Sequence, residues 1–208
     1  MGRTRHMRAI NRVGGVLCLE YINTVGEIDQ ESGKPVERLN TYEDLLVWSI
    51  EGEVLSEAAS HKLGQAGAAY PDEAARAVYR AQETREMLYR LFRMVSAGEI
   101  PASKDLNDFN LARSEALAHT YIAPQGQGFA WAWRDDEALD RMLHPVIRSA
   151  AELLTSPDLS RIKACVGTDC RWLFLDMSKN KSRRWCDMND CGNRHKARRH
   201  YQKRRVSM

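Results

Sequence analysis

The stretch that decides how this chain folds runs Cys165-Val-Gly-Thr-Asp-Cys170, then fifteen residues, then Cys186-Asp-Met-Asn-Asp-Cys191. Two closely spaced cysteine pairs joined by a short segment can bring four thiolates together as a tetrahedron, the geometry of structural zinc sites. Four protein ligands leave no open coordination position, so we expect one structural Zn²⁺ and no chemistry at the metal. The predicted ligands are Cys165, Cys170, Cys186 and Cys191.

The residues between and after these cysteines predict a treble-clef zinc finger. Residues 172–175 and 183–185 are rich in apolar and aromatic types, so we expect two strands joined by a polar turn. After Cys191 the chain has no proline and many Lys, Arg and Ala residues, which favours a helix. A segment of about 50 residues is marginal as a core of its own, so the metal is expected to supply much of its folding energy.

Two further residues bear on the ligand set. His195 lies four residues after Cys191, so a site of three cysteines and one histidine stays an alternative, although four cysteines favour a helix-surface position for His195. Cys18 stands alone in an apolar run and is predicted to be a buried core residue. Free cysteines, no cleavable signal sequence and no run of 18 apolar residues indicate a cytoplasmic protein without a membrane partner.

The net charge of +3 is the sum of two opposed regions. Residues 161–208 carry 14 Lys and Arg against 4 Asp and Glu, whereas residues 13–160 carry 13 against 24. One Zn²⁺ with four thiolates makes the C-terminal region less positive by about two charges and leaves it clearly basic. Such asymmetry predicts a polyanionic partner, with nucleic acid as the first candidate.

The predicted C-terminal helix carries most of this positive charge. Residues 193–205 contain seven Lys and Arg and no acidic residue. A helix of this kind can lie along the major groove of duplex DNA, where phosphate contacts supply affinity and arginines read guanine edges. Base stacking on RNA needs exposed aromatic residues among the charges, and the helix offers Tyr201 alone, so RNA is less favoured. The predicted nucleic-acid contacts are Arg183, Arg184, Arg194, Lys196, Arg198, Arg199, Lys203, Arg204 and Arg205.

The first 157 residues predict a mostly helical domain with a small β component, so the fold class is α+β. Ser156-Pro157-Asp158 breaks the chain where the charge changes sign, which divides it into domains 1–157 and 158–208. We expect Asp72 and Ser103 to cap helices and Pro145 to kink one. The predicted elements are a strand at 16–25, a short helix after Thr41, helices at 56–69, 72–97, 103–118 and 137–154, and a hairpin of 119–123 with 129–133.

Three sequence elements of the finger resemble the CGNR zinc-finger family. They are Phe174-Leu-Asp176, Arg183-Arg-Trp-Cys186 and Cys191-Gly-Asn-Arg194, in this order. Residues 1–157, called the body below, are similar to the ABATE domain that usually precedes this finger. The similarity lies chiefly in Leu17–Thr24 and in the helix that ends at Leu153-Leu154. The resemblance implies an ABATE domain, a treble-clef finger and a bacterial, stress-related transcription regulator.

The leading hypothesis is therefore a transcription regulator that grips duplex DNA with its finger, while residues 1–157 sense a small effector or form a homodimer. Asn23 and Thr24, at the end of the predicted strand, are the candidate ligand contacts. The alternative is an interaction module whose basic finger docks on an acidic protein surface or on its own body. An enzyme is not expected, because the sequence has no P-loop, dinucleotide fingerprint, His-Glu-x-x-His or nucleophile elbow.

Overall fold

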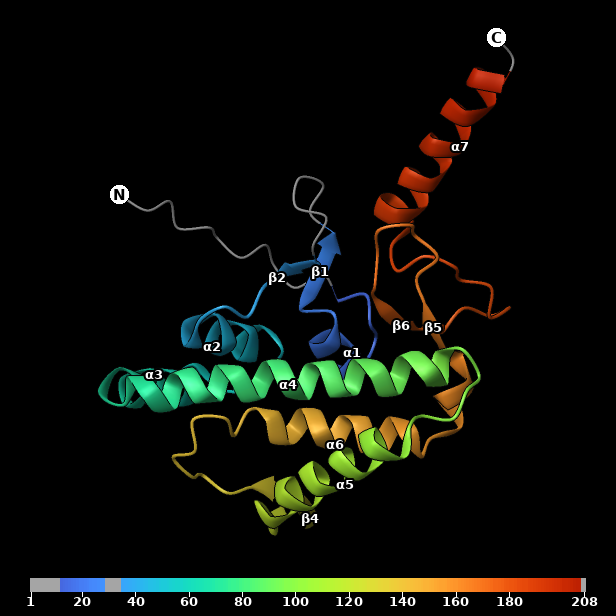
Figure 1. Ribbon diagram of the computed structural model, residues 1–208. Helices are drawn as coiled ribbons and strands as arrows, with labels where there is room; N and C mark the ends of the chain where they lie inside the picture. Colours follow the sequence, from blue (N-terminus) through green and yellow to red (C-terminus); the bar gives the residue numbers. More distant parts are fainter. Residues whose placement is uncertain (1–11, 29–34, 207–208) are drawn as a thin grey trace, which may run out of the picture.

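The structure, a computed structural model, describes residues 12–28 and 35–206, with residues 27, 28, 200, 201 and 203–206 described by their backbone alone. Its central element is α4 (Pro71–Ser96), a 26-residue helix. Within the described residues α4 contacts five other α-helices, two of which, α5 and α6, lie together on one side of it (Figure 1). These neighbours are α1 (Leu17–Ile22), α2 (Tyr42–Glu51), α3 (Glu57–Ala69), α5 (Ser103–Ala118) and α6 (Leu143–Leu154).

The described strands form three antiparallel pairs, which makes the fold α+β as predicted. No helix in the described ranges is long and apolar enough to cross a bilayer. The C-terminal region adds η1 (Pro157–Arg161), η2 (Met188–Gly192) and α7 (Asn193–Val206). The strand pairs are β1 (Val25–Ile28) with β2 (Pro35–Glu37), β3 (Thr120–Gln125) with β4 (Gly128–Trp133), and β5 (Ile162–Ala164) with β6 (Leu173–Leu175).

The predicted helices of the body follow from amphipathic periodicity and local capping. Helix α4 buries Ala77, Ala81 and Leu88 along one face, as its helical spacing predicts. Thr41 caps α2 in a capping box with Asp44, so two main-chain N–H groups at the helix start find side-chain acceptors. The hairpin is confirmed with longer strands than predicted, joined by a tight turn at residues 126–127.

The strand predicted at 16–25 is wrong, because residues 17–22 form α1 and a strand begins only at Val25. The segment is rich in β-branched and aromatic residues, which favour strands on a half-buried sheet. Its buried residues are instead Cys18, Leu19, Tyr21 and Ile22, a helical spacing that turns one face toward the core. Packing against α4 and α6 overrides the local propensity.

Three boundary predictions also need correction. Helix α6 begins at Leu143, so Pro145 lies in the first turn, where its missing N–H has no intrahelical acceptor to lose, and it causes no kink. Asp72 does not cap α4, because Pro71 already occupies the first helical position. Ser103 is itself the first residue of α5 and makes no capping hydrogen bond.

The strand predicted at 183–185 is absent from the described secondary structure, and β6 pairs with β5 instead. The register joins Ile162 to Leu175 and Ala164 to Leu173. Residues 183–185 approach this sheet through one main-chain bond, from Val166 N–H to Arg184 O at 3.1 Å. The hairpin of the finger therefore includes residues 162–164, which precede the first cysteine and for which no strand is predicted from the sequence.

Alternate residues of the β6 segment belong to two different cores. Leu173 and Leu175 pack in the main core of the body, whereas Trp172 and Phe174 pack with the cysteines in a second, smaller core. Successive side chains of a strand point to opposite faces, so one short strand serves both. The finger consequently packs directly on the body.

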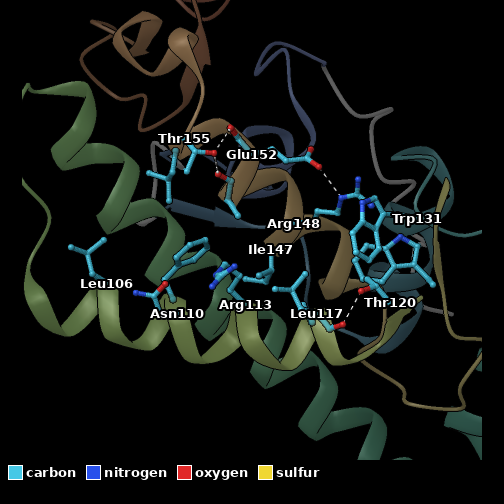
Figure 2. Close-up of a pocket in the computed structure, with 15 residues that line it drawn as sticks. Leu106, Asn110, Arg113, Leu117, Thr120, Trp131, Ile147, Arg148, Glu152 and Thr155 are labelled. Atoms are coloured by element: carbon cyan, nitrogen blue, oxygen red, sulfur yellow. Dashed lines mark hydrogen bonds and ion pairs between the residues drawn. The ribbon is translucent and has the colours of Figure 1, made fainter. Parts of the chain in front are cut away.

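Helices α5 and α6 and the β3–β4 hairpin, which lie on the other side of α4 from β1 and β2 (Figure 1), line a cavity of about 550 Å³ that is open to solvent on one side (Figure 2). Its walls are mainly apolar, and they include Phe109, Trp131, Trp133 and Ile147. Neither Asn23 nor Thr24 lines this cavity.

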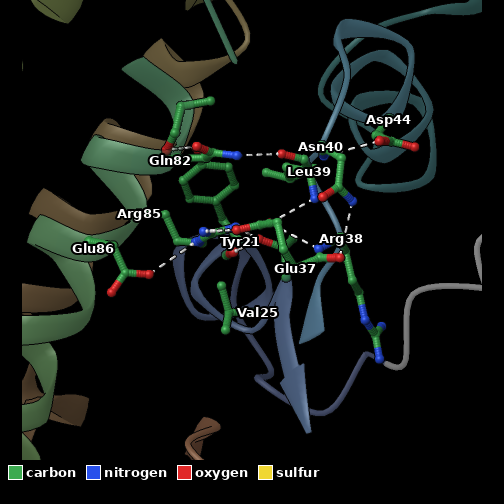
Figure 3. Close-up of polar contacts among 12 residues, drawn as sticks. Tyr21, Val25, Glu37, Arg38, Leu39, Asn40, Asp44, Gln82, Arg85 and Glu86 are labelled. Atoms are coloured by element: carbon green, nitrogen blue, oxygen red, sulfur yellow. Dashed lines mark hydrogen bonds and ion pairs between the residues drawn. The ribbon is translucent and has the colours of Figure 1, made fainter. Parts of the chain in front are cut away.

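Arg85 of α4 is the most deeply buried charged side chain of the polar cluster drawn in Figure 3, at 3% exposed. Its guanidinium donates to both Glu37 carboxylate oxygens, at 2.7 and 2.5 Å, and to Thr24 Oγ1 at 3.2 Å. Glu37 also accepts the main-chain N–H groups of Arg38 and Leu39. Burial opposes ionisation of Glu37, but Arg85 and these N–H donors hold its pKa below the usual range. The cluster ties β2 to α4.

We expect Glu37→Gln to lower the free energy of unfolding by about 3 kcal/mol, because the buried Arg85 charge loses its bidentate counterion and keeps only the 3.5 Å ion pair with Glu86. Since folding lowers the pKa of Glu37, its stabilisation is present above the unfolded value of 4.5 and disappears as the pH falls below it. The variant should lack that acid-dependent component in urea titrations at several pH values. Glu73→Gln, at an exposed ion pair with Arg76, is the matched control and should change stability by less than about 1 kcal/mol. Equal effects of the two substitutions would contradict the prediction.

Candidate metal centre and nucleic-acid surface

Four cysteine side chains converge at the end of the β5–β6 hairpin. Cys165 follows β5, Cys170 precedes β6, and Cys191 lies in η2 directly before α7. The Sγ atoms of Cys165, Cys170, Cys186 and Cys191 all lie within 4.8 Å of one another. Two of the separations are 3.7 Å (Cys170 to Cys186) and 3.5 Å (Cys186 to Cys191).

This donor set fits zinc. Thiolates at about 2.3 Å from a tetrahedral Zn²⁺ would lie about 3.8 Å apart. Main-chain N–H groups of Gly167 and Cys186 approach Cys165 Sγ at 3.4 and 3.3 Å, and the Arg194 guanidinium approaches Cys191 Sγ at 3.2 Å. Such donors partly balance the negative charge that four thiolates leave on a zinc centre.

His195 and Cys18, which are not among the four predicted ligands, both lie in positions that agree with ligation by four cysteines. His195 is exposed on α7, with its ring centroid 5.7 Å from that of Trp185. Cys18 is fully buried in the main core, as predicted, and burial raises the pKa of its thiol to about 12. A thiol that stays protonated and buried is neither a ligand nor a nucleophile.

A buried ion pair supports the loop that carries Cys186. Asp176 is fully buried and accepts hydrogen bonds from Lys163 Nζ at 2.6 Å, from Ser178 N and Oγ at 3.0 and 2.5 Å, and from Arg183 N at 3.0 Å. Burial opposes ionisation of this carboxyl, but Lys163 and the other donors hold its pKa well below the usual range. The sequence predictions give Asp176 no structural role, although it ends the Phe174-Leu-Asp176 element and directly follows an apolar strand.

The predicted basic contacts fall into two groups. The Arg183 guanidinium donates to the carbonyl oxygens of Trp185, Cys186 and Val13 and stacks on Phe174 at 4.2 Å, so it serves the finger's own structure. Arg194 is half-buried beside Asp190 and Cys191. The exposed group comprises Arg184, Lys196, Arg198 and Arg199, while the side chains of Lys203, Arg204 and Arg205 lie outside the described residues.

Asn23 and Thr24 hold the body to the finger and close the turn after α1. The Asn23 side chain donates to Leu173 O at 2.8 Å and accepts from Leu173 N at 3.0 Å, like one more residue paired with β6. Thr24 Oγ1 donates to Tyr21 O at 2.7 Å and accepts from Arg85. Their polar atoms are thus engaged within the protein.

A four-cysteine centre that carries a basic helix, packed on a mostly helical α+β body, defines a zinc-finger protein with an N-terminal accessory region. Family models support this class at both ends of the chain. Residues 161–204 match the CGNR zinc finger, and residues 15–157 match the ABATE family, described as "Putative stress-induced transcription regulator". The chain belongs to this ABATE family and carries a CGNR zinc finger. Neither family is one of enzymes. No curated protein matches the chain.

The chain at Gly167 packs closely against the cysteine side chains. A Cβ at this position would meet Cys191 Sγ at 3.1 Å, Cys170 Cβ at 3.3 Å and Cys165 Sγ at 3.4 Å. We therefore expect Gly167→Ala to displace the sulfurs and to weaken zinc binding by about tenfold or more, measured by competition with a chromogenic chelator. Gly64→Ala, where the new methyl meets Leu46 at an ordinary 3.5 Å, is the control. Unchanged zinc affinity of Gly167→Ala would show that the loop adjusts freely.

Asp176→Asn tests the support beneath the loop. The amide cannot neutralise Lys163, so we expect the free energy of unfolding to fall by about 3 kcal/mol at neutral pH. Folding lowers the pKa of Asp176, so its contribution is present above the unfolded value of 3.8 and is lost as the pH falls further. The difference between wild type and variant should therefore shrink on acidification, as followed by chemical denaturation of zinc-loaded protein. A difference that stays constant with pH would disprove the role of the charge.

Proposed function

We propose that this protein regulates transcription by binding duplex DNA through α7, with the body as a sensor of a small effector. The observation that carries the proposal is the position of α7. This 14-residue helix starts two residues after the last cysteine, contains no acidic residue, and extends away from the body (Figure 1). Its main described packing partner is η2, so its flanks are open to a ligand.

The zinc centre would act as the base of this helix. Cys191 lies two residues before α7, and the metal bonds would hold the first turn rigidly on the finger. At about 1.5 Å per residue the helix is roughly 21 Å long, enough to follow a major groove across several phosphates. The chemistry supplied by zinc is structural here, because four cysteines complete its coordination.

Lys196 and Arg199 are the best candidates for phosphate or base contact. Both are exposed and lie three residues apart, which places them on one side of α7. Arg198 is exposed but forms an ion pair with Asp169 at 2.5 Å, so it would have to exchange one partner for another. Arg184 lies over the Trp185 ring at 5.2 Å and adds charge beside the helix start.

Duplex DNA is a better fit than single-stranded RNA. Trp172 and Phe174 are buried in the finger core, and Trp185 is half-buried there, so these rings are not free to stack on bases. The exposed side of the described finger is cationic, which suits a phosphate backbone. The acidic balance of residues 13–160 would keep the body away from the same backbone.

Binding of zinc-loaded protein to a duplex should weaken with salt, with a slope of log K against log salt of about −0.9 for each phosphate contacted. We expect the double substitution Lys196→Gln, Arg199→Gln to make this slope shallower by about 1.8 in fluorescence anisotropy titrations. The matched control, Lys62→Gln with Arg76→Gln, removes the same two charges from exposed ion pairs of the body and should leave the slope unchanged.

Chelation of zinc should abolish binding, because it releases the base of α7. A flat salt response, equal effects of the two double substitutions, or undiminished binding after chelation would contradict the proposal. Single-stranded RNA of equal length provides the comparison, and tighter binding to it than to the duplex would favour an RNA-binding function instead.

A further inference from the structure

The cavity between α5, α6 and the β3–β4 hairpin has the size and lining of a small-molecule site. Its volume of about 550 Å³ lies within the usual range for ligand pockets. The apolar lining includes Leu106, Phe109, Leu117, Trp131, Ile147 and Leu154, contributed by both helices and by the hairpin (Figure 2). Trp131 is 57% exposed, so an apolar ligand would remove much aromatic surface from water.

The polar groups of the cavity leave one uncompensated charge. Arg148 and Glu152 neutralise each other through an ion pair at 2.7 Å, and the hydroxyls of Thr120 and Thr155 donate to main-chain carbonyls of their own segments. Arg113 reaches from α5 toward Ile147 of α6 (Figure 2). Arg113 is exposed, and among the side chains that the structure describes its guanidinium has no hydrogen bond or ion pair, so water is its present partner.

We propose that this cavity binds an organic monoanion, with an apolar or aromatic body between the tryptophans and helices and a carboxylate against Arg113. A guanidinium presents two parallel N–H donors that match a carboxylate, and Asn110, one helical turn before Arg113, offers a further donor at the cavity wall. The inference rests on the proposed function, since it names the site and the ligand class of the sensor.

The hairpin gains a partner from such a ligand. A two-stranded sheet is marginal on its own, and β3–β4 pairs with no third strand among the described residues. Trp131 and Trp133 lie two residues apart on β4, so both project from the same face toward the cavity. A planar ligand between this face and α6 would complete the packing that the protein alone leaves open.

The cavity also lies close to the finger along the chain. Thr155, at the end of α6, lines the cavity, and only η1 and β5 separate it from Cys165. Helix α6 also packs on α1, through a bond from Cys18 N–H to Ser149 Oγ at 3.2 Å among other contacts, and α1 packs on β6. A ligand that repositions the end of α6 therefore acts on both strands that support the metal loop.

Calorimetric titration of zinc-loaded protein with four acids tests the site: benzoate, naphthalene-2-carboxylate, 4-phenylbutyrate and decanoate, each beside its neutral amide. We expect at least one acid to bind, and its amide to bind about tenfold more weakly, because the amide lacks the charge that Arg113 recognises. Arg113→Gln should remove this preference of acid over amide. Arg76→Gln, at an exposed position of α4, should keep it. Ala151→Trp, which fills the cavity, should abolish binding of both.

Three titration results would overturn the inference: no acid of the panel binds at millimolar concentration, acid and amide bind equally, or the preference survives Arg113→Gln. A stable dimer in sedimentation, with the cavity residues protected from hydrogen exchange, would also overturn it and would assign the cavity to a second copy of the chain. Duplex binding is measured on the same preparations. Loss of acid binding with intact DNA binding removes this inference alone, whereas acid binding without DNA binding removes only the proposed function of α7.

Discussion

The shared strand β6 is the constraint on which the rest of this structure depends. Leu173 and Leu175 fill the core of the body, while Trp172 and Phe174 fill the core that holds the cysteines. Asn23 brackets the main chain of Leu173 with two hydrogen bonds, and Gly14 O accepts from Leu175 N. Because side chains alternate along a strand, a shift of β6 by one residue would exchange its two faces. The side chains that fill the core of the body would then point to the cysteine core, and those of the cysteine core would point to the body.

This arrangement alters the energetics of the finger. A segment of about 50 residues buries little apolar surface and is only marginally stable alone, and metal ligation is one source of further stability. Here the body supplies a second one, through β6, through the Arg171–Glu86 ion pair at 2.8 Å, and through Trp172 Nε1 donating to Val25 O at 2.9 Å. A zinc ion at the four cysteines would therefore have to order only the loop and the start of α7, because packing already holds the hairpin.

Sequence reasoning was strongest where the chemistry is local. Cysteine spacing predicts the cluster because a metal demands ligand type and number whatever surrounds it, and amphipathic periodicity predicts α4 because its apolar face is continuous. It failed where long-range packing determines the local structure. The residues of α1 are typical of a strand, but their burial against other helices favours a helix. Strand β6 pairs with β5 and not with residues 183–185. The Arg85–Glu37 pair and the cavity join segments far apart in the chain, so no short pattern announces them.

The position of α7 determines how far the acidic body can neutralise the positive charge of the finger. An excess of acid in residues 13–160 would cancel the cations of the finger if the two lay within a screening length, about 8 Å at physiological salt. Helix α7 extends away from the body over roughly 21 Å, so its last turn lies about two screening lengths beyond its base. The inner cations, Arg194 and Arg198, already meet Asp190 and Asp169. If the partner is a polyanion such as DNA, α7, whose sequence carries seven Lys and Arg, would attract it and the acidic body would repel it. This difference would orient the encounter before any contact forms.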